Sequence, residues 1–315
     1  MGILIVLLKI PFMKNKVLYG NLLVLSTTFI YGFNTPILKT LMPEWLDAWA
    51  ITTVRQAAAA GMFWITALFL PSQKIPIKDL FYIALGALFG LALNQLPYAL
   101  GLTKSSPVDA SILRSFTPVV VIILGAVFLH NKVSLRLLVS ILIGISGAIL
   151  IILFGGVSST RSGHLAGNLL ILLGIVCFSV YLVLIKPIAM KYQPVHVMKW
   201  MFLFAALMTL PFSYSHILEA KAFGPDTNWS VILRLSYVIV FATYIGYQVN
   251  VLALKYISST RESMYSYLQP VIATSVAILL GQDKLAIVDP VSLGLIFLSF
   301  YLVNRQKNRE KSAPA

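Results

Sequence analysis

The stretch LTKSSPVDASILRSFTPVVVIILGAVFL (residues 102–129) is long and apolar enough to cross a lipid bilayer, yet it contains Arg114 and Pro118. A second stretch, LKYISSTRESMYSYLQPVIATSVAILL (residues 254–280), has Pro270 in the corresponding place. Proline is tolerated in a lipid-spanning helix where neighbouring groups hydrogen-bond the carbonyl that it frees. Both stretches therefore predict helices that bend inside a helix bundle.

The composition of the whole chain extends this prediction to nearly all of its 315 residues, because 59% of them are hydrophobic and only 11% are charged. The mean hydropathy is +0.89. Soluble domains contain about 25% charged residues, so most of this chain is expected to lie in lipid. The lone Cys177 excludes an intramolecular disulfide.

A membrane-spanning helix needs about 20 apolar residues. Ten windows meet this requirement: 18–41, 48–70, 79–102, 107–129, 136–154, 165–186, 194–212, 232–254, 260–281 and 290–303. The apolar run Ile3–Leu8 is too short to span and lacks a basic flank, so no cleaved signal peptide is expected. Met13, followed by Lys14, is a second candidate start of the chain.

Lysine and arginine concentrate on the cytoplasmic side of membrane proteins. With the N-terminus inside, fifteen of the 24 Lys and Arg residues fall in inner segments and six in outer ones. We therefore expect both termini to face the cytoplasm, in the cell (inner) membrane. The basic segment 304–315 is an orientation anchor in this interpretation, and no nucleic-acid partner is expected.

The chain also contains an internal repeat, since shifting it by 152 positions places Pro118 on Pro270 and Ser111 on Ser263. An offset of 147 places Lys39 on Lys186. Each half holds five predicted helices, an odd number, so the second half enters the membrane from the opposite side, as in many secondary transporters. The predicted fold is an all-α integral membrane protein with ten transmembrane helices in two inverted-topology five-helix repeats around a central cavity.

This fold divides the chain into five predicted segments. They are a cytoplasmic N-terminal segment (1–17), the first repeat (18–154), a connecting loop (155–164), the second repeat (165–303) and a basic cytoplasmic tail (304–315).

Both proline-containing helices begin with capping signals. Ser106 is the expected N-cap, Pro107 takes the first turn and Asp109 the third position, and Ser259 and Glu262 repeat the spacing. Glu262 is thus either a cap or a proton-coupling residue. Pro118 and Pro270 are predicted hinges, which bend their helices for packing or act as pivots.

Polar side chains in lipid-length helices should face the bundle interior. Their helical spacing on five spans from both halves predicts a small-molecule site or, for any single residue, hydrogen bonding between helices. The candidate substrate-binding residues are Tyr31, Asn34, Asn94, Gln95, Tyr98, Arg114, Tyr244, Gln248 and Gln269.

The basic residues within the spans leave several roles open. Arg114 could extend to the outer interface, pair with a neighbouring helix or bind a substrate carboxylate. Arg55 has small residues beside it, so we expect it to pair structurally. His130, His164, His196 and His216 lie at span edges without metal-binding spacing and are expected at the interface. No metal or cofactor is expected.

Several motifs, taken in order, resemble the drug/metabolite transporter superfamily, specifically its EamA-type members. They are Tyr31-Gly32 with Asn34, Arg55 before the Ala/Gly run 57–61, Tyr98-Ala99-Leu100 with Ser105-Ser106, and the two prolines. The similarity covers residues 18–303. Typical members have Glu after each proline helix, where this chain has Asn131 and Asp283.

The resemblance implies alternating access and transport, often export, of a small solute such as an amino-acid-like metabolite, with membrane lipid as the other partner. A nucleobase, nucleotide sugar or drug is the alternative solute. A membrane enzyme is disfavoured because the few acids lie mostly in loops and no HExxH or GxSxG pattern occurs. No GxxxxGK loop for ATP is present either. The chain could act as a monomer or a homodimer.

Overall fold

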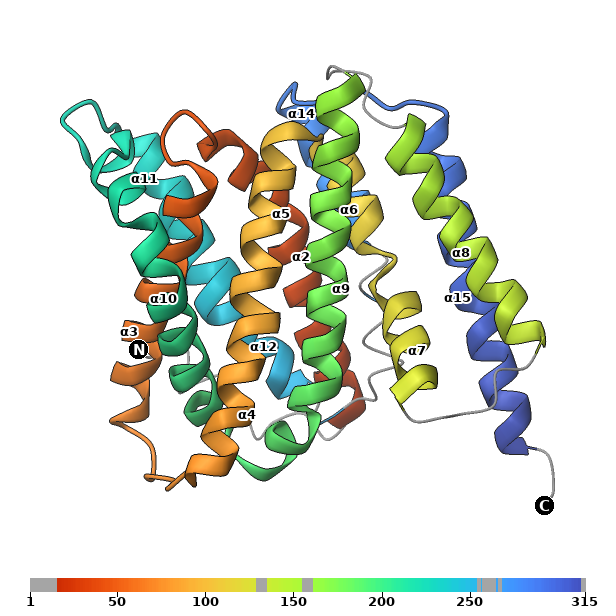
Figure 1. The fold of residues 1–315 in the computed structure, drawn as a ribbon, viewed down its shortest axis with the longest axis horizontal. Helices are drawn as coiled ribbons and strands as arrows, with labels where there is room; N and C mark the ends of the chain where they lie inside the picture. The colour runs from red at the N-terminus through yellow and green to blue at the C-terminus, as the bar shows by residue number, and fades with distance from the viewer. Residues whose placement is uncertain are drawn as a thin grey trace.

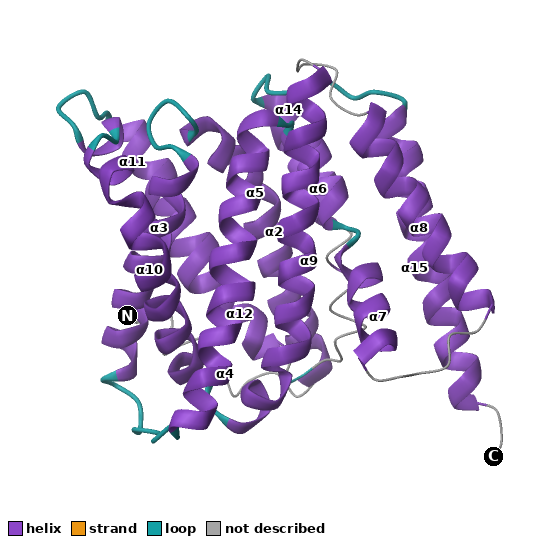
Figure 2. Cartoon of the chain, in the orientation of Figure 1, coloured by secondary structure: helices purple, strands orange, loops and turns teal. Residues whose placement is uncertain are grey.

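The computed structural model describes residues 16–128, 135–154, 161–253, 256, 265 and 268–312. In this part of the chain every regular element is a helix (Figures 1 and 2). The helices are α2 (Lys16–Leu41), α3 (Ala48–Ala67), α4 (Ile77–Ala87), η1 (Leu88–Ala92), α5 (Leu93–Lys104), α6 (Pro107–Arg114), α7 (Thr117–Phe128), α8 (Leu135–Phe154), α9 (Arg161–Lys191), α10 (Pro194–Leu218), η2 (Lys221–Phe223), α11 (Trp229–Ser236), η3 (Tyr237–Ile245), α12 (Gly246–Ala253), α14 (Leu268–Leu279) and α15 (Val288–Ser312).

Four continuous helical runs of the described residues are long and apolar enough to cross a membrane: 77–104, 164–185, 194–218 and 229–250. Shorter apolar helices occupy 138–154, 268–279 and 288–299. Large apolar side chains such as Leu68, Phe212 and Leu279 are exposed on the outside of the bundle, where lipid would cover them. The prediction of an all-α, multi-pass membrane protein is confirmed.

The helices stand roughly upright in Figure 1, and their ends form two faces. The upper end holds residues 102–109, 161–168 and 280–289, and the lower end holds 68–79 and 188–196. The closest helix pairs are α3 with α10, α5 with α9, and α8 with α15, while α2 packs against α12 and α14. The α8–α15 pair lies at one side of the bundle in Figure 1 and contacts α6 and α7.

Two of the long helical runs contain a π-helical segment, in which each backbone hydrogen bond spans five residues instead of the four of an α-helix. One is η1, between α4 and α5, and the other is η3, between α11 and α12. Such segments are rare and often lie at functional sites. The shift of 152 positions that aligns Pro118 with Pro270 places η1 inside η3, so the distortion recurs at corresponding positions of the sequence.

The helix with Pro118 was predicted to bend; it is interrupted instead, and the interruption lies before the proline. Helix α6 ends at Arg114, Ser115 and Phe116 form a turn, and α7 starts at Thr117. A proline ring clashes with the carbonyl four residues earlier, which here belongs to Arg114, so the helix ends at that residue. Pro270 is buried in the first turn of α14, and the segment before it lies largely outside the described residues.

Helix starts and close helix contacts follow from the local sequence. The Ser106 hydroxyl accepts a hydrogen bond from the Asp109 amide at 3.0 Å, which confirms the predicted N-cap. Gly101 of α5 and Gly167 of α9 face each other so closely that a Cβ atom on Gly101 would lie 2.5 Å from the Gly167 carbonyl oxygen. Glycine at both positions therefore allows the α5–α9 contact.

Candidate functional site

Arg55 lies at the centre of a polar region between the helices. It is on α3 with only 8% of its surface exposed. Its Nε donates a hydrogen bond to the Thr243 hydroxyl on η3 at 3.0 Å. The guanidinium also lies within electrostatic range of Arg114 and of three tyrosines, Tyr31, Tyr98 and Tyr247. Residues from α2, α3, α5, α6, η3 and α12 thus surround one buried cation.

Tyr98 connects Arg114 to the first helix. The Arg114 guanidinium carbon lies 5.0 Å from the centre of the Tyr98 ring, a cation–π contact. The Tyr98 hydroxyl is 2.8 Å from that of Thr35 on α2. The ring is buried, so the contact directs the half-buried Arg114 side chain towards the interior, within electrostatic range of Arg55.

Two glutamines continue the polar region towards α10 and α12. Gln95 Nε2 donates to the Tyr247 hydroxyl at 3.2 Å, and its Oε1 accepts from Gln56 at 3.4 Å. The Gln56 side-chain oxygen accepts from Thr209 on α10 at 2.9 Å. We call the whole group the central cluster: Tyr31, Thr35, Arg55, Gln56, Gln95, Tyr98, Arg114, Thr243 and Tyr247.

The central cluster carries two positive charges. Among the ion pairs of the described residues, none involves Arg55 or Arg114. Burying the Arg55 charge without an ionic partner is costly, and the half-buried Arg114 guanidinium repels it. An arginine binds a carboxylate in a planar, bidentate way, so an anionic group placed between these residues would offset both costs.

Of the nine candidate binding residues, Tyr31, Gln95, Tyr98 and Arg114 come together in the central cluster. Asn34 and Gln248 are also buried, and the Asn34 Oδ1 and Gln248 Nε2 atoms have no hydrogen-bond partner among the described residues. Unpaired buried amide groups of this kind are rare. They remain candidates for contact with a solute or with water.

Three other candidates lie elsewhere. Asn94 donates to the Gly174 carbonyl on α9 at 2.9 Å, so its amide holds two helices together. The Tyr244 hydroxyl bonds to Thr66 on α3, and its ring packs 4.9 Å from that of Phe63. Gln269 is half-buried on α14. Glu262 lies outside the described residues.

Two hollows lie at the connection between α10 and α11, not in the central cluster. One has a volume of about 400 Å³ and is lined by residues 222–224 and parts of 227–239. The other, about 220 Å³, lies between residues 43–47 and 216–221. None of the predicted site residues lines either hollow. Within the central cluster, pairs such as Gln95 with Tyr247 and Arg114 with Tyr98 are in direct contact.

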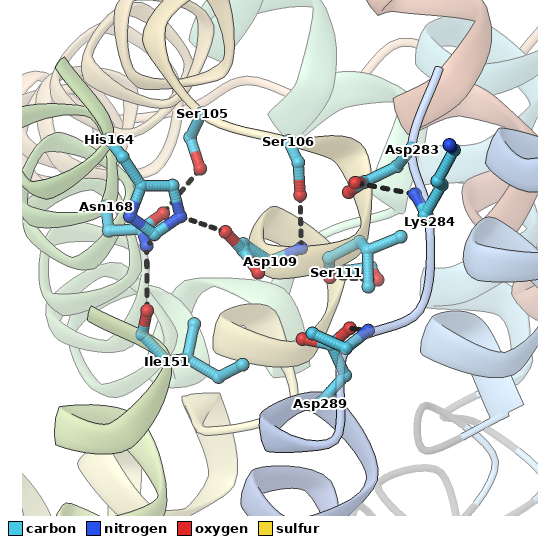
Figure 3. A network of polar contacts seen from close by, with 12 residues as sticks. Ser105, Ser106, Asp109, Ser111, Ile151, His164, Asn168, Asp283, Lys284 and Asp289 are labelled. Carbon is cyan, nitrogen blue, oxygen red and sulfur yellow. Dashed lines mark hydrogen bonds and ion pairs between the residues drawn. The ribbon is translucent and has the colours of Figure 1, made fainter. Parts of the chain in front are cut away.

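Hydrogen bonds close the bundle at its upper end. Lys39 of α2 donates to the carbonyls of Leu102, Thr103 and Ser105 at 2.5–3.2 Å. Gln282 donates to the Pro36 carbonyl at 3.0 Å. The upper end of α9 is tied to α5 and α6 by two side-chain contacts, Ser105 with Asn168 and Asp109 with His164 (Figure 3). His164, expected at an interface, is instead only 3% exposed.

The lower end is closed by a smaller set of contacts. Asp79 of α4 pairs with Lys191 and accepts a hydrogen bond from the Tyr192 hydroxyl at 2.5 Å. The hydrogen bond with Asp79 raises the pKa of the half-exposed Lys191 ammonium. The Gln193 amide donates to the Gln73 side chain at 2.9 Å. Residues 68–79 are thus held against residues 191–196.

The sequence prediction missed several members of the central cluster. Tyr247 stands 152 positions after Gln95, so the repeat offset itself could have identified it. Gln56 adjoins Arg55 but is isolated in an otherwise small-residue run. Arg55 was expected to pair structurally. It does bond to Thr243, but it also lies within electrostatic range of Arg114, which no sequence pattern indicated. Within the described residues, no three His, Cys, Asp or Glu side chains group closely enough to hold a metal ion.

Known proteins resemble this chain in sequence and in fold. The EamA-like transporter family matches it twice, at residues 18–153 and 165–305. An uncharacterized transporter of Archaeoglobus fulgidus is 25% identical over 285 residues, which cover 90% of this chain and 98% of that protein. The uncharacterized transporter YetK of Bacillus subtilis is 27% identical over 169 residues, 53% of this chain and 50% of YetK.

A solved crystal structure shares the fold. It superposes with a TM-score of 0.60 and covers 91% of this chain and 97% of its own, at 17% sequence identity. The likeness extends over almost the whole chain, so the helix arrangement in Figure 1 is one that a known protein also adopts.

Proposed function

Because this chain belongs to the EamA-like transporter family, within the drug/metabolite transporter superfamily, we propose that it is a secondary transporter for small organic anions. The family and the transporter relatives identify the chain as a carrier of small solutes and not as an enzyme. The chemical class of the solute, the direction and the mechanism are our proposal, and the following observations support them.

The substrate class rests on one observation: the buried Arg55 and the half-buried Arg114 lie within electrostatic range of each other, with no carboxylate paired to them among the described residues. A solute carboxylate between them would supply the missing charge. Tyr31, Tyr98 and Tyr247 lie within electrostatic range of Arg55, and a phenol hydroxyl can donate a hydrogen bond to a carboxylate. An acidic solute fits this cluster better than the zwitterionic amino acid that the family resemblance first suggested.

The proposed architecture is two inverted five-helix repeats, and helix contacts support it. The contact of α5 with α9 has a counterpart in that of α12 with α2, and the contact of α6 and α7 with α9 in that of α14 with α2. The pairs α3–α10 and α8–α15 join corresponding helices of the two halves. The two family matches divide the chain at the same loop.

The contacts that close the two ends support a mechanism of alternating access. At the upper end, Asp109 and Ser105 of the first half contact His164 and Asn168 of the second. At the lower end, Asp79 and Gln73 of the first half contact Lys191 and Gln193 of the second. A carrier that rocks one half against the other would break these two sets in turn.

We assign the lower end to the cytoplasm from the distribution of lysine and arginine. Arg114 lies seven residues from the start of α6, which places the cluster nearer to the upper end. In this orientation a solute would enter from the cytoplasm and leave by opening the upper contacts, which corresponds to export.

The test is transport by the purified protein in liposomes. Labelled mono- and dicarboxylates, amino acids, nucleobases and sugars are offered with and without a pH gradient, and uptake is measured. We expect carboxylates to be transported and Arg114→Gln to reduce their uptake about tenfold or more. Arg234→Gln, on α11 outside the cluster, is the matched control and should transport normally. Uptake of uncharged solutes alone, or equal uptake by both variants, would overturn the substrate assignment.

A further inference from the structure

A second polar group, separate from the central cluster, lies buried at the upper end (Figure 3). Asp109 of α6 bonds to the Nε2 atom of His164 on α9. Asn168, one helical turn further along α9, donates to Ile151 of α8 at 3.1 Å and lies 3.2 Å from the same His164 nitrogen. Asp109, His164 and Asn168 are 1%, 3% and 0% exposed.

Two more carboxylates of the second half approach this group. Asp289, at the start of α15, accepts a hydrogen bond from the Ala286 amide through one oxygen at 2.8 Å. Its other oxygen, Oδ1, is buried and has no partner among the described residues. Asp283 accepts from the Lys284 amide at 2.8 Å. Both lie within electrostatic range of Asp109, and Asp289 also of His164.

Few other charged side chains lie near this site in the part of the chain that the structure describes. Lys39 of α2 lies within electrostatic range of Asp283, while Lys104 and Lys284 are exposed. Helix α14 has no charged residue, α8 has only Arg136 at its other end, and α9 also begins with Arg161. Asp109 and Asp289 are both buried, and His164 is the described side chain of opposite sign that contacts them, so counting His164 as a cation still leaves one negative charge for a further proton to neutralise.

The geometry also shows where protons can reside. A hydrogen bond between a carboxylate and an imidazole nitrogen requires one proton between the two atoms, so Asp109 and His164 already share one. The Oδ1 of Asp289 offers a second position, because burying an ionised carboxylate oxygen without a donor costs far more than burying its neutral, protonated form. The group thus has two adjacent places for protons at the boundary between the two halves.

We propose that Asp109, His164 and Asp289 form a proton-binding site and that its protonation holds the upper end of the carrier closed. This deepens the proposed function, since it rests on an upper end that opens and closes. Closing buries the carboxylates, which is favourable only when protons neutralise them. Opening lets water reach them, so they ionise. Acid on the upper side therefore favours the closed form, and a higher pH favours the open one.

The test measures opening directly and needs no solute. Cys177 is replaced by alanine, and Ser111→Cys places a thiol on α6 beside Asp109 and Asp289 (Figure 3). A membrane-impermeant maleimide is added from the upper side between about pH 5.5 and about pH 8, the range in which a histidine site titrates. Asp226→Cys, exposed in the α10–α11 loop, corrects for the intrinsic pH dependence of the reagent.

We expect the labelling rate of Ser111→Cys, relative to Asp226→Cys, to rise about tenfold over this range. Asp289→Asn and Asp109→Asn keep the side-chain shape but cannot ionise, so each should give a low rate that does not change with pH. Glu44→Gln, which removes an exposed carboxylate at the same end, should keep the full slope.

We call the Ser111→Cys, Cys177→Ala protein without further substitutions the parent. A relative labelling rate of this parent that does not change with pH would overturn the proposal, and so would an unchanged pH slope when Asp289→Asn is added to it. The parent profile decides the matter even if the Asp109 variant does not fold. If labelling depends on pH as expected while no carboxylate is transported, the proton site stands and the proposed substrate class fails.

Discussion

Gln95 and Tyr247 stand 152 positions apart in the chain, and one hydrogen bond joins them at the centre of the bundle. The Gln95 side-chain amide donates it to the Tyr247 hydroxyl over 3.2 Å. The same spacing separates Pro118 from Pro270. The bond therefore joins two residues that occupy corresponding positions in the proposed repeats, close to the axis that would relate them. Each lies just beyond the π-helical segment of its own half, η1 or η3.

We predict that Gln95 and Tyr247 are energetically coupled. Gln95→Leu and Tyr247→Phe each remove one partner, and a double-mutant cycle on the free energy of unfolding in detergent should give a coupling of about 0.5–2 kcal/mol. Tyr244→Phe is the matched control, because its hydroxyl bonds to Thr66, and its effect should add to that of Gln95→Leu. Strict additivity of the Gln95 and Tyr247 variants would show that the bond does not form.

The two arginines should respond to a solute in a way that an ordinary structural pair would not. Arg114→Gln removes one of two repelling charges, so the protein without solute should melt at the same or a higher temperature. A bound carboxylate should raise the melting temperature of the parent protein, since a ligand stabilises the state that it binds, and should no longer do so in the variant. A variant that is less stable but still stabilised by the carboxylate would contradict this role.

Two glycine substitutions test whether the contact between α5 and α9 requires glycine. Gly101→Ala places a methyl group against the Gly167 backbone, and such overpacking costs about 1–3 kcal/mol. Gly61→Ala, in the middle of α3, meets nothing within 4 Å and should stabilise by about 0.5–1 kcal/mol, because alanine favours the helix. The unfolding free energies of the two variants in detergent check the α5–α9 packing, which equal stabilities would rule out.

The break between α6 and α7 should matter for movement more than for binding. Pro118→Ala removes the clash with the Arg114 carbonyl and allows the two helices to join. We expect the maximal transport rate to fall about tenfold while the dissociation constant of the solute stays constant, because the conformational step limits many transport and catalytic cycles. Pro211→Ala, in the unbroken helix α10, should leave both values unchanged, and a tighter or weaker binding by the Pro118 variant would assign the proline to the site itself.

Much of the helix layout could be predicted because a helix that crosses lipid needs a run of about 20 apolar residues. Every predicted window contains a helix or a run of helices in the described part of the chain. In the ninth window, 260–281, that helix is α14. The broken helix followed from Pro118, and the start of α6 from Ser106 and Asp109. Hydropathy does not record backbone hydrogen bonding, however, so the π-helical segments η1 and η3 were not predicted.

The site was predictable only in part, because a helical pattern gives the face of one helix and not its neighbour. Gln95, Tyr98 and Arg114 were placed on inward faces and do meet. Asn94 was on an inward face too, but it contacts α9 and not the central cluster. His164 looked like an interfacial residue from its place at the edge of a span. Its burial follows from Asp109, which approaches from a helix that no local pattern connects with it.

Counterflow is the measurement that tests the central claim most directly, namely that this chain is a carrier of organic anions with Arg114 in its site. Liposomes containing the protein are loaded with excess unlabelled succinate, and a trace of labelled succinate is added outside. A carrier with alternating access should accumulate label transiently above its equilibrium level, and Arg114→Gln should abolish this overshoot while Arg234→Gln keeps it. Simple equilibration without an overshoot, or an overshoot of equal size in the Arg114→Gln variant, would contradict the account.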